Sequence, residues 1–156
     1  MKRKAPKADW RDRHVAAPGP YLCLCLDEAT FHAALSDCGL KDRPLLVSNS
    51  HSNATMHSAT HADGSLVCIV ALSSWAGRNT VEVAGLLVHE AVHAWQAYAE
   101  SIGERNPGDE QEAYAVQSIA QELLAEFDTI AAKMVAGEAL TTDWRTFVKD
   151  RSEEHT

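Results

Sequence analysis

Apolar residues recur at helical spacing from Val81 to Gln96, a segment that contains no proline. The stripe they form is broad enough to face a protein core. Asn79 or Thr80 is the expected N-cap, and Glu82 follows Asn79 at the spacing of a capping box. The pattern therefore predicts an amphipathic helix that runs to about Ile102.

A second helical pattern covers Asp109–Phe127. Asn106 is its expected N-cap and Pro107 its first helical residue. Because only a short link separates the two patterns, we expect the helices to pack antiparallel, with the start of the second near the end of the first. Residues 129–148 are expected to continue the second helix and to add a short one near Trp144.

Two extended runs, Ala54–Thr60 and Leu66–Leu72, flank an Asp63-Gly64 pair, which indicates a β-hairpin. The second run is apolar on both faces and predicts a buried strand, whereas the more polar first run suits an edge strand. Shorter patterns earlier in the chain predict two strands and a helix, at Tyr21–Leu26, Leu45–Val47 and Ala29–Leu35 respectively. The expected fold class is α+β, with a small, mostly antiparallel sheet packed on two long helices.

The chain has 156 residues, 46% of them hydrophobic, which predicts one domain with a sufficient core. We expect a flexible basic arm at residues 1–20, a single domain at 21–148 and a frayed tail at 149–156. No apolar run follows the basic residues as in a signal peptide, and none approaches the roughly 20 residues that span a membrane. A net charge of −8 argues against general nucleic-acid binding outside the arm.

Four scattered cysteines, with no CxxC pair, point to reduced, buried thiols and a cytoplasmic setting. Cys23 and Cys25 are expected to point to opposite faces of a strand, so we do not expect them to pair with each other.

The segment His89-Glu-Ala-Val-His93 carries the candidate chemistry. Residues four apart on a helix lie on one face, about 5–6 Å apart at Cβ, so both rings can reach one Zn²⁺ with bonds of about 2.0–2.1 Å. Glu90 is rotated about 100° from His89, where it can reach a water on the metal. Two histidine ligands and a neighbouring general base are the machinery of a zinc-dependent peptidase.

A catalytic zinc ion needs a third protein ligand, and the second helix offers Glu110 and Glu112. The two point about 200° apart, so only one of them can serve. We prefer Glu110, because its face combines Ala113 with polar residues like the wall of a cleft, whereas Glu112 lies on a core stripe. The alternative for either is an acid that stabilises the helix N-terminus.

Tyr114 and His57 are candidates for stabilising a tetrahedral intermediate through a hydrogen-bond donor. The alternatives are interfacial packing for Tyr114 and a solvated surface ring for His57.

His89-Glu-Ala-Val-His93, followed by Glu110-Gln-Glu-Ala113-Tyr114, resembles the gluzincin metallopeptidases. Over residues 54–128 the chain also looks like small metallopeptidase-like proteins of tailed bacteriophages. The family's Glu-x-x-Ala pattern maps to Glu110, whereas the ligand spacing of other members maps to Glu112. Tyr114 stands where the family often has an acid.

The resemblance implies a minimal zincin-like domain that binds one Zn²⁺ and hydrolyses peptide bonds by a metal-activated water, with Glu90 as general base. It implies a peptide or protein substrate paired with the edge strand of the hairpin, and a location in the bacterial host cytoplasm or the virion. The alternative is a catalytically silent zincin-fold binding or assembly protein, such as a phage virion component. A third reading is a coincidental motif on a helical interaction domain.

Overall fold

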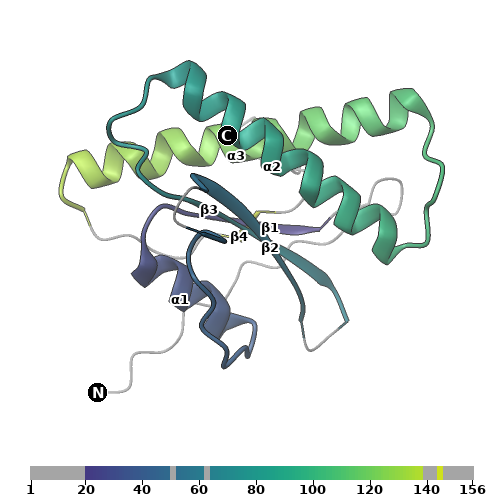
Figure 1. Cartoon of the computed structure of the whole chain (residues 1–156), viewed down its shortest axis with the longest axis horizontal. Helices are drawn as coiled ribbons and strands as arrows, with labels where there is room; N and C mark the ends of the chain where they lie inside the picture. The colour runs from purple at the N-terminus through teal and green to yellow at the C-terminus, as the bar shows by residue number, and fades with distance from the viewer. Residues whose placement is uncertain (1–19, 50–51, 62–63, 139–143, 146–156) are drawn as a thin grey trace, which may run out of the picture.

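The computed structural model describes residues 20–49, 52–61, 64–138 and 144–145, so the predicted basic arm (except residue 20) and frayed tail lie outside the described residues. A small sheet occupies the middle of the molecule. Helix α1 (Glu28–Asp37) covers one face of it, and helices α2 (Thr80–Ser101) and α3 (Asp109–Val135) lie together on the other (Figure 1). The predicted α+β class is confirmed.

The sheet has the strand order β2-β3-β1-β4, with bounds β1 Tyr21–Cys25, β2 Ala54–Thr60, β3 Leu66–Leu72 and β4 Trp144–Arg145. Strands β2 and β3 form the predicted hairpin, and β4 also pairs antiparallel, whereas β1 and β3 are parallel. The sheet is therefore mixed. Within the described part of the chain, β2 is an edge strand.

Helix α2 begins with the predicted capping box. The Glu82 backbone N–H donates to Asn79 Oδ1 at 2.9 Å, and Asn79 Nδ2 donates to Glu82 Oε1 at 3.2 Å. Helix α1 is capped by Asp27, whose Oδ1 accepts from the Thr30 backbone N–H at 2.8 Å. These local contacts explain why both helices begin at the expected place.

Three local predictions from the sequence were wrong. Gly108, rather than Asn106, is the N-cap of α3, because the helix begins only at Asp109. Asn106 lies before it, where its backbone N–H donates to Glu104 Oε1. Residues 144–145 form a strand instead of a helix, since they pair with the edge of β1. Leu45–Val47 forms no strand, and the backbone carbonyl of Leu46 is bound by a side chain instead of a neighbouring strand.

The core has two parts, one between the sheet and α2 with α3, the other between the sheet and α1. Strand β2 shows the division: Ala54 and Met56 pack on the first part and Ala59 on the second. Cys23 and Cys25 lie together in the second, with their sulfurs 3.8 Å apart. Our expectation of opposite faces was wrong, because strand side chains alternate with a period of two and these residues are two apart.

No helix in the described ranges combines the length and the apolar character needed to cross a membrane.

Candidate metal centre

Helix α2 brings the two histidine rings together. His89 Nε2 and His93 Nε2 are 3.1 Å apart, and the ring planes are inclined at 71°. Two nitrogens bound to one tetrahedral Zn²⁺ at about 2.0–2.1 Å would be roughly 3.3 Å apart. The pair therefore fits two ligand positions of a single zinc ion. Both side chains are exposed, so an ion can reach them from solvent.

Gln96 extends this pair along the same helix. Its Oε1 lies 3.2 Å from His93 Nδ1. An amide oxygen only accepts hydrogen bonds, so His93 Nδ1 carries the hydrogen in this contact. Sequence reasoning missed Gln96, although its spacing of three residues from His93 places the two side chains in reach on a helix.

Glu90 is only 5% exposed, although it lies between two exposed histidines in the motif. It sits about 60° from His93 around the helix axis, at the border between the exposed face and the core. Within the described residues its carboxylate forms no hydrogen bond or ion pair. Neither carboxylate oxygen is among the buried side-chain atoms that lack a partner in the described residues, so the carboxylate still contacts solvent.

Glu112 lies at the seam between α2 and α3, where its Oε2 accepts a hydrogen bond from Trp95 Nε1 at 3.1 Å. Trp95 is about 120° from His89 and about 160° from His93 around the axis of α2. The structure therefore places the Glu112 carboxylate on a different side of α2 from the histidine pair.

Glu110 and Tyr114 each lie two residues from Glu112 on α3, so they point about 200° away from it. Because Glu112 faces α2, both neighbours face away from α2. Glu110 is exposed, and Tyr114 is 64% exposed. The structure does not bring either of them to the histidine pair.

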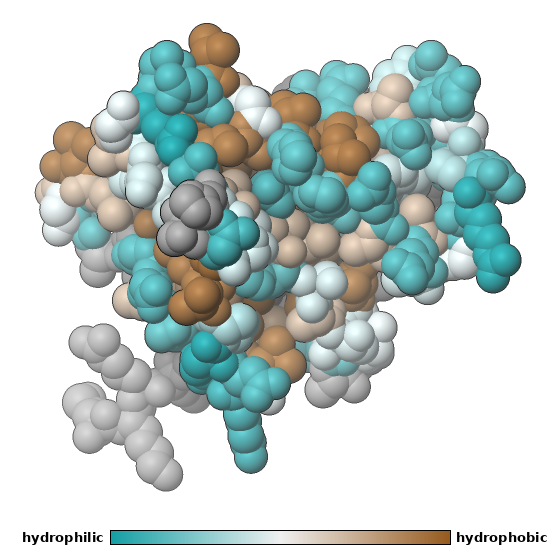
Figure 2. All heavy atoms as spheres, viewed as in Figure 1, coloured by the Kyte–Doolittle hydropathy of each residue, from teal (hydrophilic) through white to brown (hydrophobic). Residues whose placement is uncertain are grey.

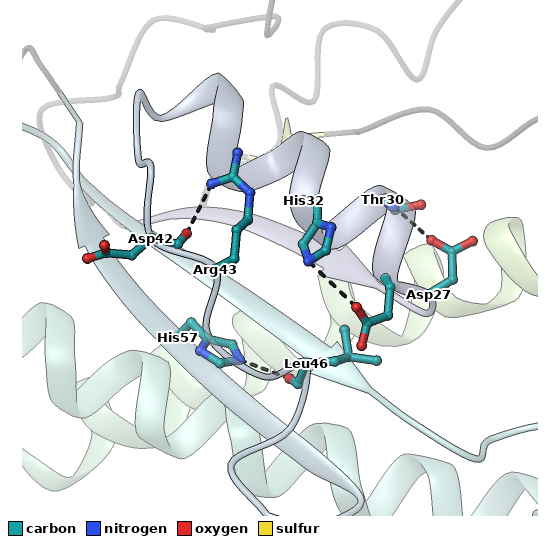
Figure 3. A network of polar contacts seen from close by, with 8 residues as sticks. Asp27, Thr30, His32, Asp42, Arg43, Leu46 and His57 are labelled. Atoms are coloured by element: carbon teal, nitrogen blue, oxygen red, sulfur yellow. Dashed lines mark hydrogen bonds and ion pairs between the residues drawn. The ribbon is translucent and has the colours of Figure 1, made fainter.

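His57 lies on the opposite face of the sheet from α2. Its Nε2 donates to the Leu46 carbonyl at 2.9 Å, and its ring packs on Phe31 of α1 with centroids 4.8 Å apart. Figure 3 shows the ring turned toward Leu46, on the side of the sheet that carries α1. The sheet thus separates His57 from the pair, and its role here is to attach the segment before β2.

In the ranges that the structure describes, no third histidine, cysteine, aspartate or glutamate completes a metal-binding group. The residues present fit two zinc ligands and a neighbouring carboxylate, but not a third ligand from α3. Helix α2 packs against α3 on one side and against the β2–β3 hairpin on the other. Glu90 lies at the edge of the side that faces the hairpin.

The molecular face that carries α2 mixes hydrophilic with hydrophobic residues (Figure 2). Its exposed apolar side chains on α2 are Val81 and Val88. The exposed residues of α2 thus combine these two valines with the histidine pair.

Comparison of the chain with protein-family models, with curated proteins and with solved structures found no match.

Proposed function

We propose that this protein is a zinc-dependent peptidase built on a minimal zincin-like domain, with His89 and His93 as metal ligands and Glu90 as general base. One observation carries the proposal. Two Nε2 atoms converge to 3.1 Å on an exposed helix face, and Glu90, which follows His89 in the same helix, is 5% exposed and has no hydrogen-bond partner in the described residues.

Zinc, when bound, would polarise a substrate carbonyl and make water more acidic. His89 and His93 would hold the ion through Nε2. Glu90 would take a proton from the attacking water and deliver it to the leaving amine. The partial burial of Glu90 limits its motion, which favours a fixed position relative to the two rings.

A peptide substrate would bind along β2. This strand is seven residues long, lies at the edge of the sheet in the described part of the chain, and packs against α2. An extended peptide can add to such an edge through main-chain hydrogen bonds, with little dependence on its sequence.

The requirement that is hardest for this proposal to meet is a third protein ligand for zinc. Glu112 would have to give up the Trp95 bond and move around α2 by more than 100°. Glu110 would have to turn from solvent toward α2. Either change requires α3 to shift or rotate relative to α2.

The need for α3 to move favours a second candidate function. In it, the protein is a catalytically silent binding or assembly protein, and the histidine pair binds metal without turnover. The observation behind it is the Trp95–Glu112 bond, which occupies one of the two acids available from α3.

Digestion of a peptide library by zinc-loaded protein, with and without a chelator, separates the two candidates. The peptidase proposal expects chelator-sensitive cleavage and a loss of at least about 100-fold in Glu90→Gln with zinc content retained. The matched control is Glu100→Gln, an exposed acid on the same helix. Unchanged cleavage in Glu90→Gln would remove Glu90 from the mechanism, and zinc-loaded protein that cleaves nothing would favour the silent candidate.

A further inference from the structure

Gln96 contacts the histidine pair on the side away from the proposed ion. Its Oε1 lies 3.2 Å from His93 Nδ1, while His93 Nε2 faces His89. The proposed reaction gives Gln96 no task. We propose that Gln96 is a positioning residue that fixes the tautomer of His93 and thereby sets its affinity for zinc, an inference that rests on the proposed zinc site.

The position of the proton on His93 decides whether its Nε2 atom can bind a metal ion. A neutral imidazole carries one N–H, and the amide oxygen of Gln96 accepts it at Nδ1. Nε2 is then left with its lone pair, directed toward His89. A metal ion binds that lone pair, whereas the opposite tautomer would place a hydrogen there. Free histidine in water prefers the opposite tautomer, so the Gln96 contact selects the form that can bind metal.

The contact between the rings agrees with this assignment. With a lone pair on His93 Nε2, the 3.1 Å separation is a hydrogen bond donated by His89 Nε2–H. The three side chains then form a chain in which His89 donates to His93 and His93 donates to Gln96. Binding of zinc would replace only the first of these bonds, with the His89 proton moving from Nε2 to Nδ1 by exchange with solvent. The second bond would continue to orient the His93 ring.

The strength of the hydrogen-bond acceptor at His93 Nδ1 should therefore change the affinity of the site for zinc. Acceptors behind a metal-binding histidine typically change metal affinity by about 10–100-fold. A carboxylate accepts more strongly than an amide, so Gln96→Glu should bind zinc at least as tightly as the unchanged protein. Gln96→Ala removes the acceptor and should weaken binding.

The test combines zinc competition against a chromophoric chelator with nitrogen-15 NMR of the metal-free protein. We expect Gln96→Ala to bind about 10–100-fold more weakly and to lose the Nδ1–H tautomer of His93, and Gln96→Glu to restore both. The matched control is Gln121→Ala, an exposed glutamine on α3, which should change neither quantity.

Gln96→Ala with affinity within twofold of the unchanged protein overturns the inference, as does weakened binding without a change of tautomer. If the unchanged protein binds no zinc, the proposed zinc site fails. The NMR result then still decides whether Gln96 sets the tautomer.

Discussion

Trp95 Nε1 donates a hydrogen bond to Glu112 Oε2 over 3.1 Å and joins the middle of α2 to the first turn of α3. This bond lies on a different side of α2 from the histidine pair, by about 120–160° around the helix axis. The bond therefore places Glu112 in the contact between α2 and α3. Experiments can then distinguish a role of Glu112 in this contact from a role as metal ligand.

Glu112→Ala is expected to lower the free energy of unfolding by about 1 kcal/mol, because a hydrogen bond to a charged acceptor is lost at a partly exposed site. Zinc affinity should stay unchanged. Denaturant unfolding and zinc titration of the same variant measure both quantities, with Asp128→Ala, at an exposed acid on α3, as control. Loss of zinc binding at full stability would instead identify Glu112 as a metal ligand.

Glu90→Gln should change the free energy of unfolding by less than about 1 kcal/mol, since the carboxylate has no partner in the described residues and its oxygens still contact solvent. A variant with unchanged stability and lost activity is typical of a residue placed for chemistry rather than for folding. Thermal and denaturant unfolding measure the change. A clearly less stable Glu90→Gln would show that the carboxylate supports the fold.

Gly85→Ala is expected to stabilise the protein by about 0.5–1 kcal/mol. Gly85 lies within α2 one turn before His89, and a Cβ at this position would have no neighbour within 4 Å. Gly103→Ala is the contrasting variant, because Gly103 has φ +72° at the end of α2, and it should destabilise. A destabilised Gly85→Ala would indicate that another backbone approaches there.

Burial raises the pKa of the Cys68 thiol to about 12, and burial together with the Asp37 charge raises that of Cys38 to about 11. The thiolate is the reactive form, so native protein at pH 8 should react slowly with a disulfide reagent, and faster once it is unfolded. Equal rates for native and unfolded protein would contradict the burial of these thiols.

The same pKa shifts determine how the stability of the protein depends on pH. Because the folded state holds both protons more tightly, their contribution to stability is complete below about pH 9 and is lost as the pH rises toward 11–12. Unfolding measured from pH 8 to 11 should show this loss, and it should be smaller in Cys68→Ala.

Local signals in the sequence predicted much of the fold. The Asn79 cap, the apolar stripe of α2 and the alternation of the hairpin depend on neighbouring residues, so they could be read without tertiary contacts. The parallel pairing of β1 with β3 and the strand at Trp144 depend on distant partners, which no local pattern reports.

In the candidate site, too, local spacing could be predicted from the sequence, whereas contacts between distant elements could not. The helical spacing of His89 and His93 was sufficient to predict their convergence. The place of Glu112 depends on how α3 is rotated against α2, and the face of His57 depends on the register of β2 with β3. A one-residue slip of that register would have turned His57 toward α2.

The most direct test of the account is zinc binding by the histidine pair, measured as affinity and stoichiometry in metal titrations of purified protein. The account predicts one zinc ion per chain, lost in both His89→Ala and His93→Ala and retained in His32→Ala, a half-exposed histidine on α1. Zinc that binds equally well to all three variants, or to none of the proteins including the unchanged one, would contradict it.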